Sequence, residues 1–149
     1  GEAVAIEADV SKAADNEKMV LETVKKFGQV DILVNNAGVV LQHPEEKTLY
    51  LAGDTVWNQH VIDALEQFQP EVILLNAGDA QVVGLGSIIM GKEDVWRVFQ
   101  AAPQAQIIAT HLEAGNHAVL TRQELARYSE EKAMASRVNI PADGETLSF

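Results

Sequence analysis

Three short apolar runs recur along the chain: VDILVNN at residues 30–36, EVILLN at 71–76 and AQIIAT at 105–110. Each run is about as long as one strand, and its polar residues lie near its ends. This pattern is typical of strands that are buried on both faces of a parallel sheet. Such strands need helices to cover them, so the runs predict an α/β fold.

Segments with helical spacing of apolar residues separate these runs. Thr121, with Glu124 three residues later, forms a capping box that predicts a helix reaching about Ala135. Ser11 is suited to cap an earlier helix, and Gly28 suits the left-handed position just after that helix ends. The expected core-facing sets are Val20, Val24 and Phe27; Trp57, Val61, Leu65 and Phe68; and Val95, Val98, Phe99 and Ala102.

The remaining strand-like segments complete the predicted sheet. Residues 3–10 read as a short strand, and residues 39–53 read as two strands joined by a polar turn. Residues 138–149 read as two short strands around a turn at 142–144. Residues 81–90 contain glycine and fit no regular element. The fold class expected is therefore α/β, a layered sheet of mostly parallel strands with flanking helices and one antiparallel hairpin.

Composition limits the possible functions. A chain of 149 residues that is 47% hydrophobic predicts a single compact domain over 1–149. Its net charge of -11 opposes binding to nucleic acid or to anionic membranes. The absence of cysteine excludes disulfides and cysteine-ligated zinc. No apolar stretch is long enough to span a bilayer and no secretion signal is evident, so we expect a cytoplasmic protein. Because Gly1 is not preceded by Met, we expect a fragment or a processed chain.

Polar side chains follow most of the apolar runs; they are Asp9, Asn36, Asp54, Asn76, Asp79 and His111. Ligands of open α/β sheets bind beyond the carboxyl ends of the strands, so we expect these residues to share one edge. Asp54 and His111 offer a carboxylate and an imidazole, which together suit a divalent metal such as zinc. Two ligands are too few, so His117 or His60 would have to complete the set. Alternatively, Asp54 could cap a helix beginning near Thr55, and His111 could simply be hydrogen-bonded.

A second pair of residues is a weaker candidate for catalysis. Tyr128 and Lys132 lie four residues apart and would share a helix face. This spacing occurs where a lysine assists a tyrosine in proton transfer. On a helix rich in charged residues, a solvated pair explains the spacing better.

Residues 1 to about 38 resemble the middle of a short-chain dehydrogenase/reductase. The resemblance rests on ADVSK at 8–12 and FGQVDILVNNAG at 27–38, which ends in a marker of that family. It implies nucleotide binding, with Asp9 and Val10 beside the cofactor adenine. The implied cofactor-binding set is Asp9, Val10, Asn35, Asn36, Ala37 and Gly38. The family's glycine-rich pyrophosphate turn and its Ser before Tyr-x-x-x-Lys are both absent.

Residues from about 39 to 149 resemble the C-terminal half of a metallo-β-lactamase-fold hydrolase of the lactonase-like branch. The blocks that carry this resemblance are VVLQHPEEKTLYLAGDTVW, PEVILLNAG, IIATHLEAGNH, LTRQEL and IPADGETLSF. The resemblance implies that Asp54 is a metal ligand able to bridge two ions and that His111 is another. The family's His-x-His-x-Asp-His cluster is absent, as is a further histidine.

Together the two resemblances predict a chimera, recombinant or engineered, with its seam near 38–40. We expect a folded protein without a complete active site, without enzymatic activity and without a cofactor. Two alternatives stay open: a residual metal-dependent hydrolase that uses Asp54 and His111, with zinc as its metal, and a weaker one, remnant dinucleotide binding. Apolar surfaces left uncovered by the missing halves would favour a homo-oligomer, most simply a dimer.

Overall fold

The computed structural model describes residues 1–9, 12–30, 38–113, 115 and 117–149. The chain divides into two compact units, Gly1–Asn35 and Asn36–Phe149. The expectation of one domain with a seam near 38–40 stays a prediction.

The first unit contains one helix, α1 (Ala13–Phe27), in its described part. Gly28 follows it with a φ of 87° and donates its N–H to the Val24 carbonyl at 2.7 Å, as predicted for a helix-ending glycine. Lys12 occupies the N-cap position, while Ser11 lies outside the described residues. The predicted strand at 3–10 is wrong over residues 3–9, which pair with no strand in the described chain.

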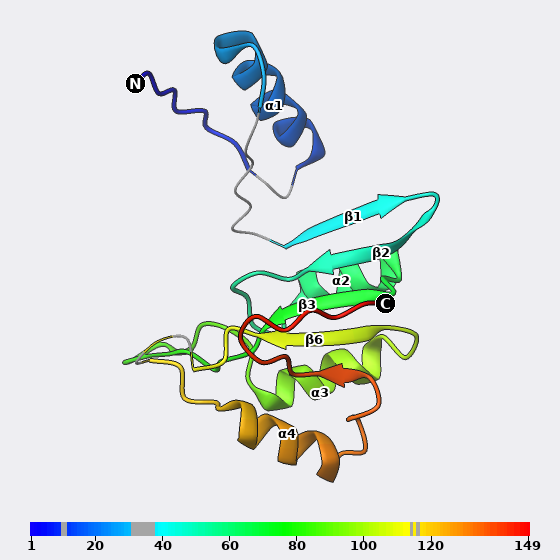
Figure 1. Ribbon diagram of the computed structural model, residues 1–149. Coiled ribbons are helices and arrows are strands. Elements are labelled where there is room, and N and C mark those ends of the chain that lie inside the picture. The colour runs from blue at the N-terminus through cyan, green and yellow to red at the C-terminus, as the bar shows by residue number, and fades with distance from the viewer. Residues whose placement is uncertain (10–11, 31–37, 114, 116) are drawn as a thin grey trace. The chain divides into compact units, whose positions relative to one another are not determined.

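The second unit is built around a five-stranded sheet (Figure 1). The outermost strand on one side pairs antiparallel with its neighbour, and the other pairings are parallel. This confirms the predicted α/β fold with its antiparallel hairpin, since the polar turn predicted within residues 39–53 joins the first two strands. In sheet order the strands are β1 (Val39–His43), β2 (Glu46–Leu51), β3 (Val72–Asn76), β6 (Gln106–Thr110) and β7 (Val138–Asn139).

Three helices and a small hairpin complete this unit. The helices are α2 (Gln59–Phe68), α3 (Lys92–Ala101) and α4 (Arg122–Glu131), and the hairpin is β4 (Gln81–Val82) with β5 (Gly86–Ser87). The capping box of Thr121 and Glu124 forms at the start of α4 as predicted. The helix ends earlier than expected, at Glu131. Trp57 precedes α2, because Asn58 is its N-cap.

The two faces of the sheet differ in how they are covered. Alternate strand residues point to opposite faces. On one face the strand side chains are almost fully buried and belong to one hydrophobic cluster with residues of all three helices. The strand residues of this cluster include Tyr50, Ile73, Leu75, Ile107 and Ala109, and the helix residues include Val61, Leu65, Val95, Val98 and Leu125.

The opposite face carries the intervening apolar side chains. Leu74 and Ile108 are half-buried on it, side by side in the parallel ladder. The C-terminal segment, coloured red in Figure 1, runs in front of the strands. Its predicted turn is present, since the Glu145 N–H donates to the Ala142 carbonyl. Of the two short strands predicted around that turn, only β7 forms; residues 145–149 are not in a strand.

The side chain of Arg137 caps the C-terminal end of α3 and connects this helix to the sheet. Its guanidinium donates to the carbonyls of Ala102 and Ala105 at 2.9 Å and of Phe99 at 3.0 Å. It also lies 3.8 Å from the centre of the Phe99 ring. A cation here satisfies the last carbonyls of the helix and complements the helix dipole. Among the described residues, no helix is both long and apolar enough to cross a bilayer.

Candidate functional site

Asp54, Asn76 and His111 lie at one edge of the sheet. Asp54 follows β2, Asn76 is the last residue of β3, and His111 directly follows the last residue of β6. These three strands are parallel neighbours, so their carboxyl ends share an edge. The predicted grouping is therefore confirmed for these three residues.

Hydrogen bonds connect the edge from strand to strand. The Asn76 side-chain amide donates to the Asp54 carboxylate at 2.7 Å. The Thr110 hydroxyl lies 3.2 Å from both the Asn76 side-chain oxygen and the Leu75 carbonyl. Because the Asn76 oxygen faces Thr110, its NH₂ group is directed at Asp54. This arrangement orients the Asp54 carboxylate, which is exposed.

The alternative role for Asp54 as a helix cap is wrong. The N-cap of α2 is Asn58, whose side-chain oxygen accepts from the Val61 N–H at 3.2 Å. The Asn58 amide in turn donates to the Thr55 hydroxyl at 3.0 Å. The carboxylate of Asp54 is thus not used to begin the helix.

The backbone around His111 is closely packed although its side chain is exposed. His111 has a φ of 60°, in the left-handed region that most residues avoid. A Cβ placed on Gly78 would lie 2.4 Å from the His111 carbonyl oxygen. The neighbouring Thr110 carbonyl accepts from the Ala77 N–H at 2.9 Å. The loop after β3 therefore fixes where the chain carries His111.

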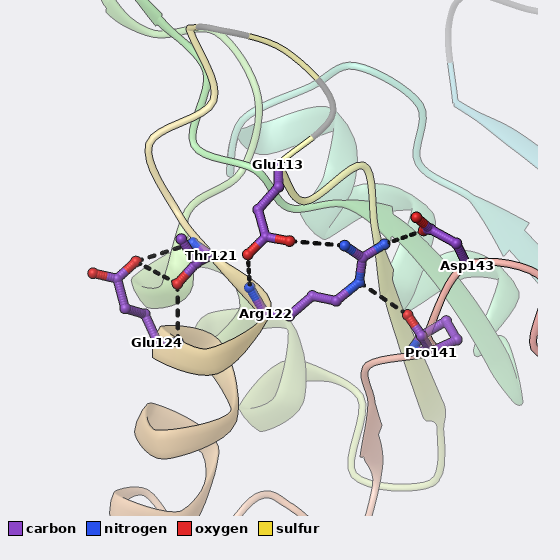
Figure 2. Close-up of polar contacts among 6 residues, drawn as sticks. All are labelled: Glu113, Thr121, Arg122, Glu124, Pro141 and Asp143. Carbon is purple, nitrogen blue, oxygen red and sulfur yellow. Dashed lines mark hydrogen bonds and ion pairs between the residues drawn. The ribbon is translucent and has the colours of Figure 1, made fainter.

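Arg122 anchors the same loop from its other end (Figure 2). Its side chain donates to the Glu113 carboxylate at 2.8 Å, and its backbone N–H donates to the other oxygen of that carboxylate at 3.2 Å. The guanidinium also binds the Pro141 carbonyl at 3.1 Å and the Asp143 carboxylate. One arginine thus joins the loop that contains His111, the start of α4 and the C-terminal segment. Sequence reasoning missed this role.

A complete metal-ligand set is not formed by the described residues. His117 is exposed, its ring lies beside Gly115, and its carbonyl accepts from the Gln81 N–H. His60 is exposed in the first turn of α2. Within the described chain, no group of three or more His, Cys, Asp or Glu residues could hold a metal ion. The metal set of Asp54, His111 and His117 remains a prediction.

Asp79 also lies just after β3, but its side chain is hydrogen-bonded to nearby residues of the small hairpin. Its carboxylate accepts from the Ser87 hydroxyl at 2.6 Å and from the Gln81 amide at 2.8 Å. Those two residues belong to β5 and β4, so Asp79 holds the small hairpin together.

The Tyr128 and Lys132 pair is not arranged for proton transfer. Burial raises the pKa of Tyr128, and the nearby Glu93 and Glu131 carboxylates raise it further, which is opposite to what a proton donor at neutral pH needs. The Lys132 ammonium lies 4.5 Å from the centre of the Trp96 ring, closer than its 5.6 Å to the Tyr128 ring. A cation–π contact accounts for its position.

The predicted cofactor-binding set is described only in part. Val10 and residues 35–37 lie outside the described residues. Asp9 forms an ion pair with Lys12 at 3.2 Å, and its N–H donates to the Asp15 carboxylate at 2.9 Å. In the second unit Gly38 adjoins Tyr50, whose hydroxyl would be 3.0 Å from an added Cβ. The nucleotide-binding role of these residues stays a prediction.

Comparison with known proteins gives different relatives for different parts of the chain. Residues 1–65 match the short chain dehydrogenase family model. UPF0173 protein YddR of Bacillus subtilis is 48% identical over 134 residues, which cover 87% of this chain and 53% of YddR.

Solved structures add a likeness to hydrolases. The isothiocyanate hydrolase from Delia radicum gut bacteria is 47% identical with a TM-score of 0.73, covering 75% of this chain and 43% of the hydrolase. A possible metal-dependent hydrolase from Veillonella parvula is 41% identical with the same TM-score and the same coverage.

Most of the chain is similar to metallo-hydrolases. The chain spans about half the length of these relatives. The short chain dehydrogenase match supports the first resemblance but extends to residue 65, beyond the predicted seam near 38–40. The hydrolase likeness supports the second resemblance, and YddR covers 87% of the chain, more than residues 39–149 alone. The chimera is not shown, and the hydrolase likeness favours the residual hydrolase hypothesis over an inactive chimera.

Proposed function

We propose that this chain contributes to a metal-dependent hydrolase site in which Asp54 and His111 bind the metal ion. The observation that carries this proposal is the hydrogen-bonded edge of the sheet, where Asn76 orients an exposed Asp54 carboxylate. The likeness to hydrolases at 47% and 41% identity supports it.

The donor types fit a divalent metal, although the described set is incomplete. A carboxylate and an imidazole are ordinary ligands of zinc. A catalytic zinc ion usually takes three protein ligands. The remaining donors would come from His60 or His117, or from a second polypeptide.

The residues of this chain would act mainly by positioning. When bound, a divalent metal polarises a substrate or acidifies a water molecule. Thr110 and Asn76 hold the Asp54 carboxylate toward the edge. Gly78 and Arg122 fix the loop that carries His111, and such outer contacts commonly tune the affinity of ligand residues.

Calorimetric titration of metal-stripped protein with zinc tests the proposal. Wild-type protein should take up zinc in a stoichiometric ratio, and the combined substitutions Asp54→Ala and His111→Ala should abolish uptake. The matched control is Asp63→Ala with His43→Ala. Asp63 is also an exposed aspartate that accepts from a single side-chain amide, that of Gln59 at 2.8 Å, and His43 is an exposed histidine. Equal uptake by both double variants, or none by wild type, would contradict the proposal.

Dinucleotide binding by the N-terminal residues is a second candidate. The match of residues 1–65 to the short chain dehydrogenase model favours it. Calorimetry with NAD should then give a saturable isotherm that Asp9→Ala weakens, whereas a flat trace up to millimolar NAD would reject it. An inactive chimera instead predicts cooperative unfolding that neither zinc nor NAD affects.

A further inference from the structure

Thr110 is the last residue of β6 and directly precedes His111. In the parallel ladder it pairs with Asn76, the last residue of β3. Its side chain is half-buried, whereas the candidate ligands Asp54 and His111 are exposed. Thr110 therefore lies beside the candidate ligands, with its hydroxyl hydrogen-bonded within the sheet.

The hydrogen bonds between Thr110 and Asp54 have a fixed direction. An ionised carboxylate only accepts hydrogen bonds, so Asn76 must present its NH₂ group to Asp54, at 2.7 Å. The Asn76 side-chain oxygen then faces Thr110, and the two groups 3.2 Å from the Thr110 hydroxyl are both carbonyl oxygens. The hydroxyl must therefore donate, and the bonds run from Thr110 through Asn76 to the Asp54 carboxylate.

The stiffness of the threonine side chain makes it suited to this role. A β-branched residue has few χ1 rotamers, so the strand backbone determines where the Thr110 hydroxyl points. The amide of Asn76 can face either way and depends on its partners for its direction. Without the Thr110 donor it would be held at one end only, and the Asp54 carboxylate would be less firmly oriented.

The main chain of Thr110 acts on the other candidate ligand. Its carbonyl accepts from the Ala77 N–H at 2.9 Å, which holds the loop after β3 to the end of β6. The next residue of that loop is Gly78, where an added Cβ would lie 2.4 Å from the His111 carbonyl oxygen. The placements of Asp54 and His111 thus both depend on contacts of Thr110.

We infer that Thr110 is a positioning residue of the candidate metal site, which orients Asp54 through Asn76 and fixes the start of the loop that carries His111. Its effect on metal affinity rests on the proposed hydrolase function. Outer contacts of this kind commonly change metal affinity by about 10- to 100-fold. The orientation of Asp54 needs no metal, so it can be measured separately.

The first measurement uses full-length, metal-free protein. NMR follows the two protons of the Asn76 side-chain amide, and Asn76→Ala identifies their signals. Thr110→Val keeps the β-branched shape and the backbone bonds but removes the donor, so it should shift these signals and speed their exchange with water. Thr110→Ser retains the hydroxyl and should preserve most of the wild-type signals. Thr48→Val is the matched control, because Thr48 is a half-buried threonine of β2, three residues before that strand ends.

Zinc titration by calorimetry on the same variants is the second measurement. Thr110→Val should weaken zinc binding at least about tenfold, Thr110→Ser should restore most of the affinity, and Thr48→Val should leave it unchanged. Urea unfolding checks the fold, which valine should preserve because it suits a strand. Asn76→Ala breaks the same chain of bonds at the next residue, so it should also weaken zinc binding and covers the case in which Thr110→Val does not fold.

Unchanged Asn76 amide signals in Thr110→Val would overturn the proposal. So would a zinc affinity that Thr110→Val leaves intact, or one that Thr110→Ser fails to restore. If the amide signals respond as expected but the wild-type protein takes up no zinc, the orientation of Asp54 by Thr110 stands and the hydrolase function falls.

Discussion

At position 78 the chain has no room for a side chain. An added Cβ would lie 2.4 Å from the His111 carbonyl oxygen and 3.2 Å from the Ala118 Cβ. Its nearest neighbour is backbone, which cannot rotate away as a flexible side chain can. The sequence Asn-Ala-Gly at the end of β3 therefore does more than end a strand, because its glycine allows the loop after β6 to approach.

Gly78→Ala should destabilise the fold and displace His111. We expect a loss of about 1–3 kcal/mol in the free energy of unfolding, the usual range for overpacking a buried position. Urea unfolding measures the loss, and NMR of the His111 ring protons should show a shifted environment. Gly1→Ala is the control, since nothing lies within 4 Å of its added Cβ. Wild-type stability with unchanged ring signals would show that the loop adapts.

Thr121→Ala should show how much the charge of Glu124 contributes to the cap of α4. The Thr121 N–H and hydroxyl donate to the Glu124 carboxylate, and these bonds lower the pKa of Glu124. Losing the Thr121 cap should cost about 1 kcal/mol at neutral pH. It should also return the Glu124 pKa toward its usual value, which carboxyl NMR titration measures.

The pH dependence of that loss has a definite sign. Because the Glu124 pKa is lower in the folded state, its contribution is present above the unfolded pKa and disappears as pH falls through the folded pKa. The stability gap between wild type and Thr121→Ala should therefore narrow in acid. If the stability difference between wild type and Thr121→Ala stayed constant as pH falls, the cap would depend only on the uncharged hydrogen bond from the Glu124 N–H to the Thr121 hydroxyl.

Among the secondary-structure elements, those with strong periodicity were the ones that sequence could predict. The runs that form β3 and β6 were predicted from apolar residues alone, and the start of α4 was predicted from its capping box. The β4–β5 hairpin was not, because each strand has only two residues and the carboxylate of Asp79 joins them. Such short elements depend on tertiary contacts that a local pattern does not contain.

The residues of the candidate site also fall into those that the sequence could predict and those that it could not. Asp54 and His111 stand at strand ends, so the order of elements was enough to bring them to one edge. Arg122 was missed because its side-chain partners lie 9 and 21 residues away along the chain, at Glu113 and Asp143. Only the folded chain brings these three residues together.

Arg137→Met tests the contribution of one residue to an element boundary. Methionine keeps most of the apolar stem, but the carbonyls of Phe99, Ala102 and Ala105 lose their guanidinium donors. We expect a loss of about 2 kcal/mol, because hydrogen bonds from a charged group are replaced by unsatisfied acceptors. Urea unfolding followed by circular dichroism measures it. Arg127→Met is the control, because Arg127 forms an exposed 3.9 Å pair with Glu131 and its substitution should change stability little.

At the scale of the whole molecule, the two units differ in how much they bury. In the first unit α1 has no buried residue, and its predicted core residues Val20, Val24 and Phe27 are 50%, 40% and 43% exposed. Among the described residues, the hydrophobic core cluster lies between Tyr50 and Val138 in the second unit. Hydrophobic stabilisation scales with buried apolar area, so it is concentrated there.

A chain limited to residues 38–149 should therefore unfold cooperatively with nearly the free energy of the full-length protein. In the described part of residues 1–37, the helix α1 has no buried residue, so we expect a loss within about 1 kcal/mol. Urea denaturation of both chains, followed by circular dichroism and by tryptophan fluorescence, measures it. Trp57 and Trp96 both belong to the retained unit, so the fluorescence signal reports the same core in each chain. A loss of several kcal/mol would instead mean that the dehydrogenase-like residues stabilise the hydrolase-like sheet, and the prediction of a single domain over 1–149 would then be favoured.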